Sequence, residues 1–259
     1  MLDTPTLSTR RPNNKDEAWR YADEAFLAQA DAAAIQHWRE LDVPAGETRF
    51  ERKVFRTEPG ASGAVDRLRV HVGAGSRFEA FAVIIGGAYQ RVELDVTLEE
   101  GAHFEFGGVT IGGDGKTQEF VTTTRHDSPR ATSNQTVRAV HWDRATGNFL
   151  GEIKVARHAQ KTNAAQDFKG LLLEAGASAN AVPQLEIYAD DVLCAHGATV
   201  GQLDEAARYY MAARGLPPEL AKKLLVQAFI GDAFVALEDD STRENLLEAA
   251  LGALEEAQL

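Results

Sequence analysis

The segment Arg91–Gly101, RVELDVTLEEG, decides the fold class of this chain. Its apolar side chains, Val92, Leu94, Val96 and Leu98, alternate with polar ones. Because successive side chains of a β-strand point to opposite faces, this period predicts a strand with one face in an apolar core. The same pattern recurs in DRLRVHV, HFEFGGVTI, GNFLGEIKV and QLEIY, so we expect strands from about residue 49 to about residue 200.

A loose internal repeat suggests how these strands are arranged. Laying VHVGAGSRFEAF over VTLEEGAHFEF aligns Gly75 with Gly101, about 26 residues apart, and Gly176 follows about three such periods later. Short strands punctuated by glycine at a period of about 20 to 30 residues are typical of a β-solenoid, in which each coil rests on the one before. A β-sandwich or a jelly roll is the alternative all-β architecture.

Helical patterns flank the β region. On the N-terminal side, an Ala- and Glu-rich stretch has Asn14 placed to cap a helix and Glu17 three residues on. On the C-terminal side, we expect one helix from Asp204 to Arg214, ended by Gly215. The expected division is residues 1–45 as an N-terminal helical segment, 46–200 as the β core and 201–259 as a C-terminal helical domain.

Two further helices are expected after Gly215. The first begins at Pro217 or Pro218, and the last opens with a capping box from Ser241 to Glu244. Each carries apolar residues at helical spacing: Leu220, Leu224, Leu225, Ala228 and Phe229 in the first, and Leu246, Leu247, Ala250, Leu251 and Leu254 in the last.

Composition restricts the class of partner and the compartment. Of 259 residues, 44% are hydrophobic and 25% are charged, and the net charge is −12. This charge argues against a broad surface for nucleic acid or anionic membranes, which requires a concentrated basic face. No run of about 18 apolar residues occurs, and the start MLDTPTLSTRRPNNKDE has no apolar core of a secretory signal. We therefore expect a cytoplasmic protein, without membrane or nucleic-acid partners, whose single cysteine stays reduced.

That cysteine, Cys194, lies two residues before His196 in ADDVLCAHGATV. On a strand the two side chains share one face, where a thiolate and an imidazole could both reach iron, copper or zinc. Two ligands do not complete such a site, and the others would have to come from distant residues or a second chain. The structural alternative is a buried Cys acting as a small apolar residue beside a hydrogen-bonded His.

Other candidate residues have structural interpretations as well. Cys194 could act as a nucleophile only if a second histidine, His126, His141 or His158, approached it. Asp190 and Asp191 could serve glycoside hydrolysis or bind calcium, but neighbouring strand residues face opposite sides, which favours a turn or a bulge. The glycines of IGGDGKT do not form a phosphate-binding loop, because the G-x-x-x-x-G-K-[ST] pattern is absent.

Four segments resemble the SufB and SufD family of the Suf iron-sulfur cluster assembly system. They are KDEAWRY (Lys15–Tyr21), AQKTNAAQDFKGLLL (Ala159–Leu173), PQLEIYADDVLCAHGATVGQLD (Pro183–Asp204) and YYMAARGLP (Tyr209–Pro217). The resemblance implies a right-handed parallel β-helix core with helical ends. Glycine at position 197 and the single cysteine are similar to the SufD branch, because SufB members usually carry Glu after the histidine and further N-terminal cysteines.

The resemblance also implies a function and its partners. Family members pair SufB with SufD through their β-helices and dock the ABC-type ATPase SufC through C-terminal helices, without catalysing a reaction themselves. His196 would then be the main ligand of a transient iron or iron-sulfur cluster shared with SufB, with Cys194 as a second candidate, and no cofactor would be tightly bound to the isolated chain. The residues expected to bind a partner are Tyr209, Tyr210, Arg214, Leu224 and Phe229.

Three functions are compatible with these features of the sequence. The first is the assembly scaffold. The second is a carbohydrate-active β-solenoid enzyme that uses Asp190 or Asp191, and the third is a self-associating β-solenoid without chemistry. Because an exposed strand edge or apolar patch tends to be covered, we expect the isolated chain to form a homodimer.

Overall fold

The computed structural model describes residues 10–56 and 62–257. Residues 1–9, most of the polar lead considered above, and residues 258–259 of the expected C-terminal domain lie outside the described part. Within the described ranges, no helix combines the length and the hydropathy needed to cross a membrane.

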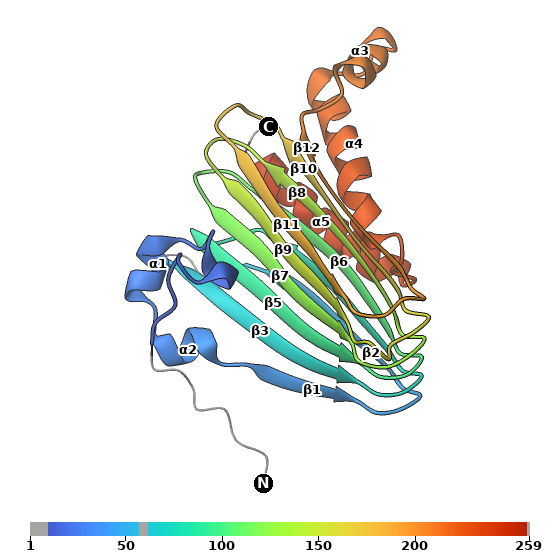
Figure 1. The fold of residues 1–259 in the computed structure, drawn as a ribbon. Helices are drawn as coiled ribbons and strands as arrows, with labels where there is room; N and C mark the ends of the chain where they lie inside the picture. Colours follow the sequence, from blue (N-terminus) through green and yellow to red (C-terminus); the bar gives the residue numbers. More distant parts are fainter. Residues whose placement is uncertain (1–9, 57–61, 258–259) are drawn as a thin grey trace.

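Two six-stranded parallel sheets form the body of the molecule (Figure 1). One sheet, sheet A, has the order β1-β3-β5-β7-β9-β11, and the other, sheet B, has the order β12-β10-β8-β6-β4-β2. In chain order the strands are β1 (Arg39–Val43), β2 (Thr48–Phe55), β3 (Gly63–Val72), β4 (Arg77–Ile84), β5 (Tyr89–Leu98), β6 (His103–Gly112), β7 (Thr117–His126), β8 (Thr132–His141), β9 (Thr146–Val155), β10 (Asn163–Leu172), β11 (Ser178–Ile187) and β12 (Leu193–Gly201).

The strand order confirms the predicted β-solenoid. Each coil places one strand in sheet A and the next in sheet B, so every strand pairs in parallel with the strand two positions along the chain. The β-sandwich and jelly-roll alternatives are wrong, because those folds are built from antiparallel strands. The first strand begins at Arg39, before the expected start of the core at residue 46.

The apolar core lies between the two sheets. Val92, Leu94, Val96 and Leu98 all point inward and are at most 5% exposed, as their alternation predicted. Phenylalanine rings stack along the interior: the ring centres of Phe78 and Phe104 are 5.7 Å apart, and those of Phe149 and Phe168 are 5.8 Å apart. Stacking of equivalent positions on successive coils therefore builds one continuous core.

Glycines at equivalent turns explain part of the repeat. Gly75 and Gly101 have φ values of 65° and 66°, in the left-handed region that favours glycine, and both lie between a sheet A strand and the next sheet B strand. Gly176 does not belong to this series, since it lies at the opposite edge between β10 and β11. A β-carbon at Gly176 would lie 2.3 Å from the carbonyl oxygen of Asp143, so close packing, not φ, requires glycine there.

Three short helices form the expected N-terminal helical segment: η1 (Glu17–Trp19), α1 (Glu24–Gln29) and α2 (Ala32–Gln36). Asp23 and Asp31 cap α1 and α2 with their carboxylates. Asn14 is not a cap, because its amide donates to the carbonyl oxygen of Ala22. These helices lie on the outer face of sheet A, where Trp19, Phe26, Leu27 and Ile35 bury their side chains with Tyr89 of β5.

The C-terminal helices are α3 (Glu205–Ala213), α4 (Pro218–Gly231), η2 (Asp232–Phe234) and α5 (Asp240–Glu256). The expected end of α3 at Gly215, whose φ is 84°, and the expected start of α4 at Pro218 are confirmed. The capping box at Ser241 is wrong. Asp239 caps α5 instead, because its carboxylate accepts hydrogen bonds from the Thr242 amide and from the hydroxyls of Ser241 and Thr242.

The helices α4, η2 and α5 cover the outer face of sheet B (Figure 1). As predicted, Leu246, Ala250, Leu251 and Leu254 of α5 form a buried face. The buried residues of α4 are Ala221, Val226 and Ile230, whereas Leu220 and Leu224 of the predicted face are 45% and 37% exposed. The helix is thus rotated so that part of its leucine face points away from the sheet.

Candidate functional site

The last coil, β11 and β12, ends the solenoid with an uncovered interior. In the described chain, β11 pairs only with β9 and β12 only with β10, so the other edge of each strand has no partner strand. The strand register identifies the side chains of the last coil that point inward, because each is paired with a residue of the preceding coil whose side chain lies in the core. Ala181 of β11 pairs with Phe149 of β9, and Ala198 of β12 pairs with Phe168 of β10. We call this set the apolar end face: Ala179, Ala181, Pro183, Leu185, Ile187, Cys194, His196, Ala198 and Val200.

The apolar end face has the chemistry of a protein interior, yet it is accessible. Ile187 is 38% exposed and Val200 is 48% exposed, although equivalent positions on earlier coils are buried. Cys194 and His196 are its only residues with ionisable side chains. An edge of this kind normally pairs with another chain or is covered. The last coil is therefore the best candidate in this molecule for a protein interface.

Cys194 and His196 share this face, as the sequence predicted, but their surroundings differ. Cys194 is partly buried beside Ile153, Val155 and Ala164. Burial raises the pKa of its thiol, although a hydrogen bond from the backbone of Ala164 acts in the opposite direction. His196 is exposed. Because a metal binds the thiolate and not the thiol, the raised pKa of Cys194 disfavours metal binding by this thiol in the isolated chain.

The two residues do not complete a metal site. Across residues 10–56 and 62–257, no three His, Cys, Asp or Glu side chains are grouped so that they could hold a metal ion. His126 and His141 lie within the solenoid on other coils and are fully buried. They bond to Ser133 and to Thr110, respectively, so neither is placed as a base for Cys194.

Gln166 braces the interior directly beneath His196. The two residues are register partners on β10 and β12, and Gln166 is 2% exposed. Its amide nitrogen donates to the carbonyl oxygens of Gly151, at 3.2 Å, and Gln184, at 3.3 Å. A β-carbon at position 151 would lie 2.2 Å from the Gln166 side-chain oxygen, so a larger residue there would displace Gln166. The hydrogen bond to Gln184 runs across the interior to the last coil and carries no signal in the local sequence pattern.

Asp190 and Asp191 lie in the bend between β11 and β12, so the prediction of a turn is confirmed. Asp191 is engaged in that turn: its carboxylate pairs with Lys161, and its backbone amide donates to the Gln160 side-chain oxygen at 2.9 Å. The carboxylate and the backbone amide of Asp191 therefore help to organise the turn between β11 and β12.

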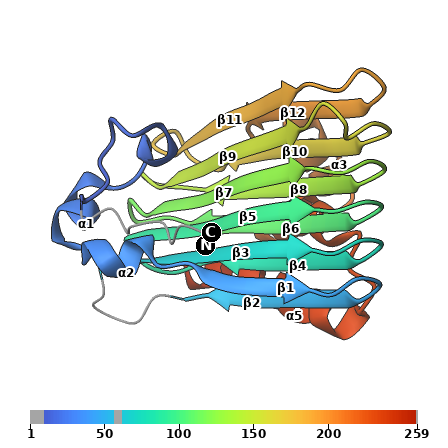
Figure 2. The ribbon, with the colours of Figure 1, turned by 60° about the horizontal axis from the view of Figure 1, so that its bottom comes forward.

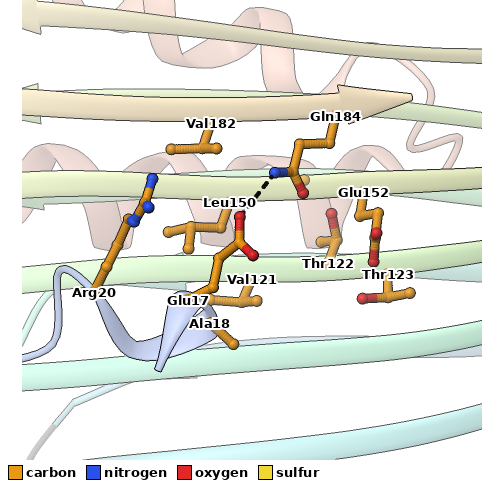
Figure 3. Close-up of a pocket in the computed structure, with 11 residues that line it drawn as sticks. Glu17, Ala18, Arg20, Val121, Thr122, Thr123, Leu150, Glu152, Val182 and Gln184 are labelled. Carbon is orange, nitrogen blue, oxygen red and sulfur yellow. Dashed lines mark hydrogen bonds between the residues drawn. The ribbon is translucent and has the colours of Figure 1, made fainter. Parts of the chain in front are cut away.

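A separate cavity of about 180 Å³ lies between η1 and the outer face of sheet A (Figure 3). Val121, Leu150 and Val182, from β7, β9 and β11, form its apolar side. Across it, the amide of Gln184 donates to the carboxylate of Glu17 at 3.2 Å, which connects η1 to the last coil. Neither Cys194 nor His196 lines this cavity, so it is distinct from the predicted metal position.

The predicted partner-binding residues lie on α3 and α4. No residue of α3 is buried, and Tyr209 and Tyr210 are 78% and 58% exposed. The Arg214 guanidinium lies 4.4 Å from the centre of the Tyr210 ring, and a hollow of about 230 Å³ separates α3 from α4 beside Tyr209. Figure 1 shows α3 extending beyond the solenoid. Phe229 differs from the others, because it is partly buried and packs with the core between the helices and sheet B.

Comparison with known proteins gives the family. The model of the SufBD core domain, described as SUF system FeS cluster assembly, matches residues 28–229. The chain therefore belongs to the SufBD family of iron-sulfur cluster assembly proteins. It is 31% identical over 165 residues to the iron-sulfur cluster assembly protein SufD of Escherichia coli, covering 63% of this chain and 39% of that protein.

Other relatives agree with this assignment. A SufBD family protein of Synechocystis is 32% identical over 176 residues, which cover 68% of this chain and 39% of that protein. SufD of Bacillus subtilis is 30% identical over 148 residues, which cover 57% of this chain and 34% of that protein. The similarity to proteins named SufD supports the SufD branch. The chain spans less than two thirds of the length of each of these relatives.

Proposed function

We propose that this chain is a non-enzymatic, cytoplasmic scaffold subunit for iron-sulfur cluster assembly. It pairs with a SufB-like subunit through the apolar end face and docks a SufC-like ABC-type ATPase through α3 and α4. The observation that carries the proposal is the uncovered end of the last coil, where interior side chains such as Ile187 and Val200 remain exposed. A second β-solenoid that presents a similar end would bury these side chains and join the two cores.

His196 contributes to a transient iron or cluster site at this proposed interface. The cluster is the cargo of the assembly and not a resident cofactor of this chain. The two ionisable side chains of the apolar end face, Cys194 and His196, supply too few ligands alone, so the partner provides the others. The raised pKa of Cys194 favours its neutral thiol, which gives it a packing role until a metal or a partner's positive charge lowers that pKa.

The SufC-like ATPase is proposed to bind Tyr209 and Tyr210. Aromatic residues and arginine are enriched at the centres of protein interfaces, and both tyrosines lie exposed on a helix that extends from the body. Arg214 lies against the Tyr210 ring, and Leu224 is 37% exposed on α4, while Phe229 packs between α4 and sheet B. A movement of the bound ATPase would act on α4, which is packed on the sheet, and thereby on the solenoid.

Anaerobic co-purification with the SufB-like and SufC-like subunits tests the proposed site. Wild type is compared with His196→Ala and with Thr199→Ala, a matched control on the outward face of the same strand, and bound iron and acid-labile sulfide are measured on the intact complex. We expect all three complexes to form and only His196→Ala to lose iron. If His196→Ala retains wild-type iron, the histidine is structural and the site lies on the partner. If wild type does not assemble with the SufB-like subunit, the scaffold function itself is wrong.

A further inference from the structure

The two ends of the solenoid differ in the charge of their inward-facing side chains. The first coil, β1 and β2, lies at the end opposite the last coil (Figure 2). The strand register again identifies inward-facing positions. Arg39, Glu51 and Lys53 are paired with Leu68, Ala80 and Ala82, respectively, and the latter three residues lie in the core. The other inward-facing positions include apolar Leu41, Val43 and Phe55, and Val43 and Phe55 are buried. The charged side chains occupy the interior positions that correspond to Pro183, His196 and Ala198 of the last coil.

These charges are paired across the space between the two sheets. Arg39 of β1 and Glu51 of β2 approach to 2.7 Å, and Lys53 of β2 and Asp66 of β3 also approach to 2.7 Å. The bond with Glu51 raises the pKa of Arg39 despite partial burial. All four side chains are 29–49% exposed, so they retain water at the rim. We call Arg39, Glu51, Lys53 and Asp66 the charged end face.

Without such charges, the two ends of different copies would fit each other. Both ends present unpaired parallel strand edges in the described chain, one strand from each sheet. Stacking the last coil of one copy on the first coil of another would continue both sheets and the core. Such a head-to-tail contact does not close and would generate an open filament. Inward-pointing charges are a known means of preventing edge-to-edge association, because burying them against an apolar surface removes their water.

We propose that the charged end face closes the first coil against the apolar end face of a second copy, so that the solenoid associates only through its last coil. In a stack that continues the register, Arg39, Glu51 and Lys53 would face Pro183, His196 and Ala198 of the second copy, and these charges would lose hydration without gaining partners of opposite charge. Pairing of two last coils, in contrast, buries apolar surface on both sides. This inference rests on the proposed function only in taking the last coil as the surface that associates.

The test replaces Arg39, Glu51, Lys53 and Asp66 with leucine and follows the oligomeric state by sedimentation velocity over a range of concentrations. We expect the weight-average mass of this variant to rise continuously with concentration to severalfold that of wild type. Two controls isolate the cause: Glu40→Leu with Arg52→Leu removes outward charges of the same strands, and Arg39→Glu with Glu51→Arg keeps the inward pair in reverse. Both should behave as wild type. Adding Val200→Lys to the leucine variant should stop its growth.

A folded leucine variant with the wild-type mass distribution at every concentration would overturn the inference, as would wild type itself growing beyond a dimer. If the fourfold variant does not fold, as judged by circular dichroism, the double variant Arg39→Leu with Glu51→Leu replaces it, and its mass distribution is compared with that of wild type in the same way. A failure of the proposed function gives a different result. If Val200→Lys does not stop the rise in mass of the leucine variant, the copies associate through another surface, and the last coil is not the associating surface.

Discussion

The guanidinium of Arg91 lies 4.0 Å from the centre of the Trp19 ring, and it joins the N-terminal segment to sheet A. Arg91 is 0% exposed, pairs with Glu93 and Glu119 at 3.0 Å each, and donates to the carbonyl oxygen of Ala18 at 2.8 Å. Burial opposes ionisation of Glu93, but the charges of Arg91 and Arg67 outweigh it and lower its pKa. The KDEAWRY segment is therefore held by a buried charge network as well as by apolar contacts.

Removing the cation of this network should destabilise the fold strongly. Arg91→Met leaves Glu119 buried without its cation and Glu93 with Arg67 alone, and breaking a buried pair in this way costs about 3–5 kcal/mol. Urea unfolding measures the loss. Arg144→Met removes an arginine whose side chain is 81% exposed and should cost less than about 0.5 kcal/mol. Equal effects of the two substitutions would show that the buried network contributes little.

Stability should fall as the pH falls from about 6.5 to about 4. Burial lowers the pKa of both His126 and His141 to about 4, from 6.5, against hydrogen bonds to the backbone of Ala131 and Gly112 that raise it. The unfolded chain therefore binds protons first, so the stabilisation is complete above pH 6.5 and is lost as the pH falls through the folded-state pKa. Each histidine contributes a slope of up to about 1.4 kcal/mol per pH unit.

Urea unfolding between pH 7 and pH 4.5 measures this dependence. His126→Gln should flatten the curve, whereas His158→Gln, at an exposed position, should leave its slope unchanged. An unchanged slope in His126→Gln would contradict the assignment of the acid sensitivity to this residue.

Arg138 should control how firmly the C-terminal helices attach to sheet B. It is 2% exposed and binds Asp167 of β10 at 2.6 Å and Asp232 of η2 at 2.5 Å. Arg138→Met removes these charged hydrogen bonds, each worth about 1.5–3 kcal/mol. Hydrogen exchange should then accelerate in α4, η2 and α5 but not in β5 or β7. Lys169→Met, which removes a 44% exposed cation near the same carboxylates, should have a much smaller effect.

The docking surface for the ATPase can be tested without disturbing the fold. Because no residue of α3 is buried, Tyr209→Ser with Tyr210→Ser should leave the unfolding curve unchanged. Loss of two central aromatic contacts should weaken binding of the SufC-like subunit at least about tenfold, by calorimetry. Glu248→Gln on α5 is the control. Unchanged affinity in the tyrosine variant would place the ATPase elsewhere.

The isolated chain should form a homodimer through the apolar end face. Val200→Lys introduces a charge at a 48% exposed interior position and should shift the chain toward monomer at micromolar concentration. Thr199→Lys changes the neighbouring outward residue and should leave the dimer intact. Sedimentation equilibrium gives the mass of each. A monomeric wild type would contradict the expectation.

The sequence alone determined the repeating part of this protein. Alternation in RVELDVTLEEG predicts strands, and Gly75 and Gly101 mark equivalent turns, because both signals depend on local backbone geometry. The position of Cys194 and His196 on one face follows from the same period. Family motifs pointed to the SufBD family, and the apolar pattern of α5 predicted its buried face.

Tertiary structure decided which surfaces are covered. The strand pattern predicts that Arg91 points outward to solvent. In the structure, Trp19 and Ala18, more than 70 positions earlier in the chain, cover its guanidinium. In α4, Ala221 faces sheet B while Leu220 faces solvent, although leucine is the more apolar residue. The charged and apolar ends likewise become opposite ends only when the coils stack. Local sequence fixes the period of a strand or helix, but burial depends on residues that meet only in the folded chain.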